Sequence, residues 1–176
     1  LLDGVWRQLM LPGAWGGAGL IVSVFVIGAI IQLPVDLFAT FVIEERFDFN
    51  RTSTATYLAD MVKRTVLSLL IGIPCAALIV WLMDSIGPLW WLAAWCVWLC
   101  INLLAAWAFP VLIAPLFNRF TPLEDATLAA RIAQLLERHG FSSSGIFVAD
   151  GSKRSGHGNA YFTGLGASKR IVFYDT

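Results

Sequence analysis

The chain has 176 residues, of which 58% are hydrophobic and only 14% are charged, and its mean hydropathy is +0.74. Soluble domains are typically about 45–50% apolar and about 25% charged. This composition therefore excludes an ordinary soluble domain and favours a protein that has lipid as its solvent. The formal net charge is zero, which indicates neither nucleic acid nor an acidic partner. The chain begins at Leu1 without the basic start of a signal peptide, and we interpret it as a segment of a longer protein.

Three predominantly apolar stretches are long enough to cross a bilayer, which takes about 20 residues. They predict spans at about 18–43, 65–83 and 89–112, within a transmembrane region that covers residues 1–118. Asp36 lies near the end of the first span. An ionisable residue at this depth is a candidate functional residue, whereas the same residue at the level of the lipid headgroups needs no function. The sequence leaves both interpretations open.

The distribution of lysine and arginine predicts the orientation of the spans. The connection between the first two spans is basic, and it contains Arg46, Arg51, Lys63 and Arg64. The segment after the third span is also basic, whereas the turn Asp84–Leu89 has neither residue type. Because basic loops stay in the cytoplasm, we expect both basic regions on the cytoplasmic side and the turn on the other.

The composition changes to that of a soluble domain after residue 118. Thr121–Glu124 has the pattern of a helix start, with Thr121 as N-cap, Pro122 as first helical residue and Glu124 closing a capping box. Apolar residues then recur at helical spacing: Leu128, Ile132, Leu135 and Leu136. His139-Gly140 is expected to end this helix, with the glycine just beyond the last turn.

Strands are predicted at residues 146–149, 160–163 and 170–174, and the last two are expected to pair as a hairpin across Gly164–Lys169. A polar, glycine-rich loop, Asp150–Thr163, runs into the second of these strands and contains Asn159. Such a strand offers an exposed edge to which an extended peptide can add as a further strand. An ordinary surface hairpin has the same appearance.

His157 lies in this loop, and the sequence has only one other histidine. Three or four protein ligands are needed to hold zinc. We therefore interpret His157 as a loop histidine that makes hydrogen bonds rather than as a metal ligand. The sequence contains no H-E-x-x-H motif and, taken alone, no complete active site.

Three segments together resemble the membrane zinc metallopeptidases of the M48 family, most closely the CAAX prenyl protease (Ste24 endopeptidase) subfamily. They are Glu44–Thr52 (EERFDFNRT), Ala114–Leu123 (APLFNRFTPL), and Asp150–Thr163 (DGSKRSGHGNAYFT) followed by Lys169–Thr176 (KRIVFYDT). One departure is Asp48, at a position where the family usually has glycine. The resemblance covers the chain from about Leu33 to Thr176.

The resemblance implies an α-helical integral membrane protein, with three transmembrane helices in this chain, followed by the beginning of an α/β gluzincin-type peptidase domain. Residues 119–176 would form the N-terminal part of that cytoplasmic zinc peptidase domain. In the family, Zn2+ is held by two histidines of an HExxH helix and a later glutamate. That helix is expected after Thr176, so the resemblance implies no catalytic residue and no metal ligand here, and an inactive chain when alone.

The resemblance also implies that Asn159, Ala160 and Tyr161 bind substrate backbone, with His157 as a possible accessory residue. The intact protein would be a zinc metalloendopeptidase of the bacterial inner membrane or the endoplasmic reticulum membrane. It would cleave peptides bound as a β-strand, with C-terminal CAAX-type peptides as one candidate class. Its expected partners are a peptide or protein substrate, the lipid bilayer and the remaining segments of the same protein, with no nucleic acid. The alternative is a non-catalytic, transporter-like or scaffolding membrane protein.

Overall fold

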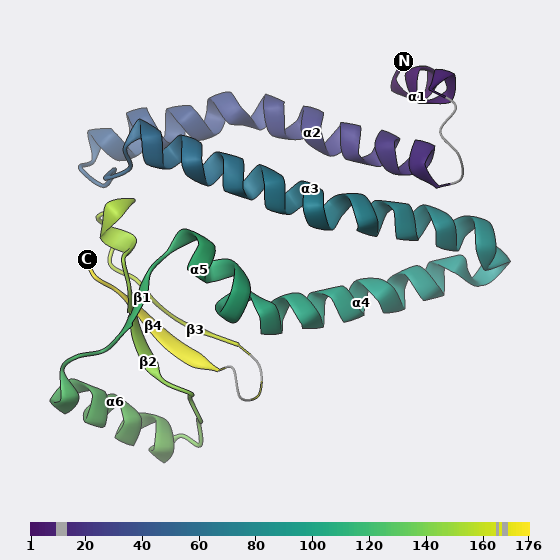
Figure 1. Ribbon diagram of the computed structural model, residues 1–176. Coiled ribbons are helices and arrows are strands. Elements are labelled where there is room, and N and C mark those ends of the chain that lie inside the picture. Colours follow the sequence, from purple (N-terminus) through teal and green to yellow (C-terminus); the bar gives the residue numbers. More distant parts are fainter. Residues whose placement is uncertain (10–13, 165, 167–168) are drawn as a thin grey trace. The chain divides into compact units, whose positions relative to one another are not determined.

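The computed structural model describes residues 1–9, 14–164, 166 and 169–176 (Figure 1). The chain forms two compact units, of which the first comprises Leu1–Ile43 and Tyr57–Cys100 and the second Glu44–Thr56 and Ile101–Thr176. The first unit is helical and the second carries a sheet. From the N-terminus, the helical elements are α1 (Leu2–Gln8), α2 (Trp15–Phe38) with a π-helical continuation (Ala39–Glu44), α3 (Thr54–Ser85), a 3-10 turn (Gly87–Leu89) and α4 (Trp90–Ala108). A π-helical turn (Phe109–Ile113) and the short helix α5 (Ala114–Phe117) follow α4.

Among the described residues, three helical segments are long and apolar enough to cross a membrane: Trp15–Glu44, Thr54–Ser85 and Gly87–Phe117. Each contains one of the predicted spans, so the prediction of three long apolar helices is confirmed. Large apolar side chains on them are exposed, for example Phe25 at 75% and Leu70 at 69%. Exposing so much apolar surface to water is unfavourable, whereas the hydrocarbon core of a bilayer solvates it. The protein is an integral membrane protein, and the limits of its transmembrane region and domains remain predictions.

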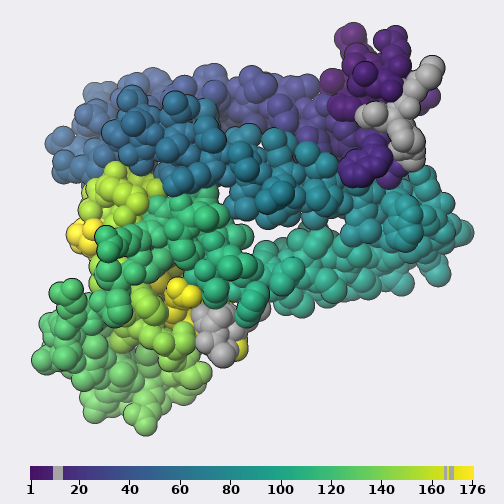
Figure 2. All heavy atoms as spheres, viewed as in Figure 1, coloured from purple at the N-terminus to yellow at the C-terminus, as the bar shows by residue number. Residues whose placement is uncertain are grey.

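Helices α2 and α3 pack side by side in antiparallel directions (Figures 1 and 2). Near the start of α2, a Cβ atom on Gly17 would lie 3.0 Å from a methyl group of Val80. At the other end, the rings of Phe41 and Tyr57 meet edge to face with centroids 5.4 Å apart. Without a hydrophobic driving force between helices in lipid, close approach at small residues such as Gly17 supplies the packing energy.

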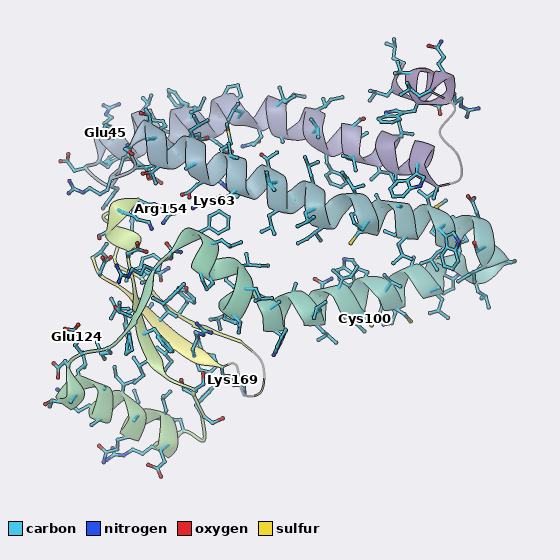
Figure 3. The ribbon with its side chains drawn as sticks, in the orientation of Figure 1. Glu45, Lys63, Cys100, Glu124, Arg154 and Lys169 are labelled. Atoms are coloured by element: carbon cyan, nitrogen blue, oxygen red, sulfur yellow. The ribbon has the colours of Figure 1, made fainter. Side chains whose placement is uncertain are left out.

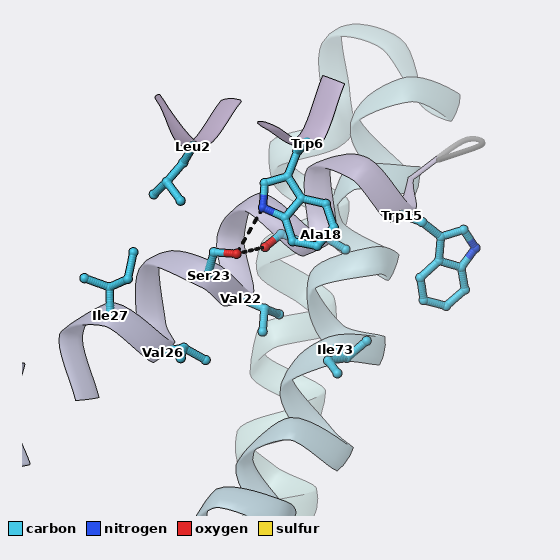
Figure 4. Close-up of a pocket in the computed structure, with 10 residues that line it drawn as sticks. Leu2, Trp6, Trp15, Ala18, Val22, Ser23, Val26, Ile27 and Ile73 are labelled. Atoms are coloured by element: carbon cyan, nitrogen blue, oxygen red, sulfur yellow. Dashed lines mark hydrogen bonds between the residues drawn. The ribbon is translucent and has the colours of Figure 1, made fainter. Parts of the chain in front are cut away.

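An apolar cavity of about 460 Å3 lies beside the start of α2 (Figure 4). Trp6 of α1 reaches into it, and its Nε1–H donates to Ser23 Oγ at 3.0 Å. The Ser23 hydroxyl in turn donates to the Gly19 carbonyl at 2.8 Å. A Cβ atom on Gly19 would lie 2.4 Å from the Trp6 ring, so only glycine admits the indole here. These bonds satisfy the polar atoms of this otherwise apolar region.

The second unit contains a four-stranded sheet in the order β1-β2-β4-β3. Its strands are β1 (Phe120–Pro122), β2 (Ile146–Ala149), β3 (Ala160–Thr163) and β4 (Arg170–Tyr174). β4 is parallel to β2 and antiparallel to β3, while β1 is antiparallel to β2. Val172 of β4 and Ala149 of β2 are fully buried and form the core of the sheet. The three predicted strands and the pairing of the last two are confirmed, and residues 165, 167 and 168 of the predicted turn lie outside the described residues.

The prediction that a helix starts at Thr121 is wrong. Thr121 lies in β1, opposite Val148 of β2. Helix α6 (Ala126–Arg138) starts after Asp125, which accepts the Leu128 N–H at 2.9 Å as the N-cap. The capping pattern was ambiguous because Asp125, four residues after Thr121, also has a side-chain oxygen that can cap a helix. In the structure the backbone around Thr121 pairs with β2 instead.

The predicted end of this helix is confirmed. Gly140 has a φ of +68°, a left-handed backbone conformation that glycine adopts without strain. Its N–H donates to the Glu137 carbonyl at 3.1 Å, and the Phe141 N–H donates to the Leu136 carbonyl at 2.9 Å. These two bonds form a Schellman motif, which satisfies carbonyls that the helix end leaves unpaired.

Asp48, in the connection between α2 and α3, has a φ of +59°. This value lies in the left-handed region, which glycine occupies freely and which aspartate tolerates better than most side chains. A glycine here, which the resemblance led us to expect, would adopt this conformation without strain. The departure at Asp48 therefore preserves the backbone path at a small conformational cost.

Gly151 provides a test of packing in the second unit. A Cβ atom there would lie 2.7–3.3 Å from the Cδ2, Cγ and Cβ atoms of Tyr174, so the tyrosine has to shift. We expect Gly151→Ala to lower the free energy of unfolding by about 1–3 kcal/mol, the usual cost of overpacking. Gly156→Ala is the matched control, because its nearest contact would be an ordinary 3.6 Å. Thermal unfolding followed by circular dichroism compares them, and equal melting temperatures would contradict this packing.

Candidate functional site

Strand β3 is an edge strand of the described sheet, with β4 on one side only. Just before it, the Asn159 carbonyl accepts the Tyr174 N–H at 2.9 Å. Antiparallel strands alternate between residues that bond to the partner strand and residues that face away from it. Counting from Asn159, the backbone groups of Tyr161 and Thr163 face β4, whereas those of Ala160 and Phe162 face outward. The outward residues are both exposed, Phe162 at 44%.

The side chain of Asn159 is turned onto this outward edge. Its Oδ1 accepts the N–H of Ala160 at 2.8 Å, which occupies the first outward donor of the strand. The outward groups that follow are the Ala160 carbonyl and the N–H and carbonyl of Phe162. Among the described residues no further strand pairs with them. This edge therefore leaves three backbone groups without a strand partner among the described residues, and it begins at a polar side chain that bonds to its first donor.

Tyr161 contributes a side chain rather than backbone to this region. Its ring meets the Tyr174 ring edge to face, with centroids 6.1 Å apart. Burial, with a smaller contribution from Tyr174, raises the pKa of Tyr161 above its ordinary 10.0, and the charge of Arg170 opposes this only in part. Tyr161 is therefore a neutral hydroxyl at physiological pH. If it binds substrate, it does so through the ring or the hydroxyl.

His157 is held by three contacts in the loop that leads to β3. Its ring stacks on the Phe49 ring with centroids 3.8 Å apart and an interplanar angle of 26°. Its Nδ1 hydrogen-bonds to Ser155 Oγ at 2.8 Å, and its carbonyl accepts the Thr176 hydroxyl at 3.1 Å. These contacts match the prediction of a hydrogen-bonding loop histidine. The stacking on Phe49, more than a hundred positions away in the sequence, was not predicted.

The chain after β4 is anchored to the turn after β2. Both carboxylate oxygens of Asp175 accept hydrogen bonds at 2.7 Å, one from the Ser152 N–H and the other from its hydroxyl. Burial on its own raises the pKa of Asp175, but these donors and the charge of Lys153 outweigh it, and the pKa lies below its ordinary 3.8. This pair was not predicted either, because no local pattern in the sequence connects residues 152 and 175.

The described residues do not fit a zinc site. No group of three or more histidine, cysteine, aspartate or glutamate side chains lies together in this part of the chain. Zinc needs three or four such ligands in a defined geometry. No catalytic step can therefore be assigned to a metal held by these residues, and what they provide is an ordered strand edge.

Comparison with known proteins identifies the family of this chain. A family model described as the CAAX prenyl protease N-terminal region, with five membrane helices, matches residues 1–119. The model of peptidase family M48 matches residues 122–176. The chain belongs to the M48 peptidases of the CAAX prenyl protease group. The resemblance noted from the three sequence segments is thereby confirmed.

Individual relatives of this group are similar over most of the chain. The CAAX prenyl protease 1 homolog of Arabidopsis thaliana is 43% identical over 84% of this chain and 35% of its own length. CAAX prenyl protease 1 of Saccharomyces cerevisiae is 42% identical over 85% of this chain and 33% of its own. The crystal structure of S. mikatae Ste24p superposes with a TM-score of 0.88 at 35% identity, covering 99% of this chain and 42% of that one. The chain thus spans about a third of the length of the curated relatives it matches.

The depressed pKa of Asp175 leads to a prediction about acid stability. A carboxylate with a lowered pKa stabilises the fold above its unfolded pKa, and this stabilisation is lost as the pH falls through the folded pKa. Ser152→Ala removes the hydroxyl donor, so the pKa of Asp175 should rise toward 3.8. Carboxyl-detected NMR titration measures it, with Ser144→Ala as a control that removes a hydroxyl bonded to the Lys169 carbonyl instead. An unchanged Asp175 titration in Ser152→Ala would contradict the assignment.

Proposed function

We propose that this chain is part of a membrane metalloendopeptidase and that its edge strand β3 binds the peptide to be cleaved. The observation that carries the proposal is the outward edge of Ala160 and Phe162, next to Asn159, in a chain of the M48 peptidase group. A peptide leaving water must find partners for its backbone groups, and an edge strand supplies them in sequence. Binding in this way fixes the direction and register of the peptide before any bond is broken.

Asn159 has two roles in this proposal. Its Oδ1 accepts the Ala160 N–H when no peptide is bound, which satisfies the first donor of the edge and discourages pairing with other chains at that point. When a peptide adds, the side chain is displaced, and its amide becomes available to the substrate backbone. Tyr161 and His157 border this position, the former through its side chain and the latter as an accessory residue of the preceding loop.

The cofactor and substrates follow from the family rather than from the described residues. We propose zinc as the metal of the intact protein, with its ligands outside the described residues, since these do not form a metal site. Relatives are named CAAX prenyl proteases, and C-terminal CAAX-type peptides are accordingly the first substrate class to test. The remaining segments of the same protein are then required partners, and the chain alone should not cleave peptides.

Asn159→Ala tests the edge in a full-length protein that contains this chain. An unpaired polar group at a desolvated site costs about 1–3 kcal/mol, so kcat/KM should fall roughly ten- to a hundredfold. Zinc content and melting temperature should stay the same, because Asn159 is exposed. Gln134→Ala, which removes an exposed amide from α6, is the matched control. Cleavage of a fluorogenic peptide that ends in a CAAX sequence gives the rates.

Two further variants separate the roles of this site. Asn159→Asp keeps an acceptor for the Ala160 N–H but lacks the amide donor, so a loss as large as that of Asn159→Ala assigns the effect to the substrate contact. His157→Ala should cost less, because its ring supports the loop rather than the edge. Wild-type activity in Asn159→Ala with normal zinc content would refute the edge proposal. Absence of any cleavage by the wild-type protein would favour a non-catalytic transporter-like or scaffolding role.

We further propose that the second unit's sheet faces the cytoplasm, because two regions are rich in lysine and arginine. One is the connection between α2 and α3 together with the N-terminal part of α3, which contain Arg46, Arg51, Lys63 and Arg64, and the other is the chain after α5. In a background with the three native cysteines replaced by alanine, Arg51→Cys and Ser143→Cys should react with an impermeant thiol reagent added from the cytoplasmic side. Ser85→Cys should react from the opposite side. Position 85 is a better labelling site than position 87, because the φ of +67° at Gly87 disfavours cysteine there. Labelling of residues 51 and 85 from the same side would contradict this topology.

A further inference from the structure

The loop that precedes the substrate edge is paired with the connection between the first two membrane helices. Asn50 and Ser155 form an antiparallel β-bridge. The Arg51 N–H donates to the Arg154 carbonyl at 3.0 Å, and the Gly156 N–H donates to the Phe49 carbonyl at 2.7 Å. We call this pairing of residues 49–52 with residues 154–156 the clasp. It joins segments that lie about a hundred positions apart in the sequence.

Side chains of the connection between α2 and α3 reinforce the clasp. The Thr52 hydroxyl donates to the Arg154 carbonyl at 2.9 Å, so this one oxygen accepts two hydrogen bonds from the connection. The Asn50 side chain holds the connection in shape, since its Oδ1 accepts the Thr52 N–H at 2.8 Å. The Phe49 ring covers the His157 ring immediately beyond the pairing.

The guanidinium of Arg154 attaches the clasp to the end of the third membrane-spanning segment. It donates to the Phe117 carbonyl at 2.6 Å and to Asn118 Oδ1 at 2.7 Å. Figure 3 labels Arg154 in the turn between β2 and β3. Phe117 is the last residue of helix α5 (Ala114–Phe117), and the last carbonyls of a helix take their partners from outside it. A planar, charged fork can hold both acceptors at once, which a lysine ammonium on a flexible stem does less well.

The clasp ends three residues before Asn159, where the outward edge begins. The loop that leads into β3 is therefore attached to two parts of the chain that leave the membrane-spanning helices, the connection 45–53 and residues 117–118. A strand edge binds a peptide well only when its backbone groups are already in line, and the fraction of molecules with an ordered edge scales the apparent affinity.

We propose that Arg154 and Thr52 are positioning residues that hold the substrate edge in its binding-competent conformation through the clasp. The predicted effect on substrate binding rests on the proposed peptidase function, whereas the clasp itself is independent of that function. Neither residue touches the peptide. Their effect is to keep the edge ordered before the peptide arrives, so they determine how much substrate is needed rather than how fast bound substrate reacts.

Thr52→Val and Arg154→Lys test this in a full-length protein that contains the chain. Each removes one attachment of the clasp while keeping shape or charge, so the ordered fraction of the edge falls and KM should rise roughly three- to tenfold. The value of kcat should stay within about twofold of wild type. A purely structural role predicts the reverse, with fewer active molecules, a lower maximal rate and an unchanged KM. Thr127→Val and Arg138→Lys on exposed positions of α6 are matched controls.

A disulfide across the clasp provides a rescue. Residues facing each other in an antiparallel bridge have Cα atoms about 4.5–5.5 Å apart, within the range that a disulfide spans. Asn50→Cys with Ser155→Cys, in a background without native cysteines, should restore the KM of Thr52→Val when oxidised with glutathione disulfide and lose the rescue when reduced. A KM equal to that of the controls in both single variants, or no difference between oxidised and reduced protein, would overturn the proposal.

Hydrogen exchange on the full-length protein in lipid nanodiscs tests the clasp without any enzyme assay. The amides of Arg51 and Gly156 donate across it, so they should exchange slowly, and at least tenfold faster in Thr52→Val or Arg154→Lys. Unchanged exchange in both variants would refute the positioning role. If the full-length protein neither binds nor cleaves peptides, the proposed function fails, and the exchange rates still decide whether the clasp orders this edge.

Discussion

Strand β4 hydrogen-bonds to β2 on one side and to β3 on the other, and the candidate site depends on this double pairing. With Val172 fully buried at its centre, β4 cannot be the strand that meets a ligand. We propose that its neighbour β3 has this role, because the outer backbone groups of β3 have no strand partner among the described residues. A buried strand thus supplies rigidity, and its neighbour supplies the unpaired groups that a peptide needs.

Much of the fold could be predicted because its elements are encoded locally. The three apolar helices, the strands at 146–149, 160–163 and 170–174, and the glycine end of α6 each follow from a run of neighbouring residues. The helix start at Thr121 was predicted wrongly, since the same residues satisfy a capping pattern and a short strand. What decided between them was pairing with Val148, an interaction that a local pattern does not contain.

The candidate site divides in the same way. The exposed hairpin strand with Asn159 could be found from its polar, glycine-rich approach and from family resemblance. The Asn159 bond to Ala160 and the Ser152–Asp175 pair could not, because side-chain direction is set only by the folded backbone. Segments 44–52 and 150–163 were both singled out, yet no periodicity in either indicates that they pair with each other. Contacts between residues so far apart carry no signal in a single sequence.

The left-handed backbone at Asp48 has a consequence for how substitutions combine. A side chain in this conformation costs up to about 1 kcal/mol more than glycine, and the neighbouring contacts of the connection have to offset it. Effects of residues within one such network are not additive. A relative with glycine at this position would tolerate loss of the Thr52 hydroxyl better than this protein does. The stability lost with one contact of this connection therefore depends in part on which residue stands four positions earlier in the chain.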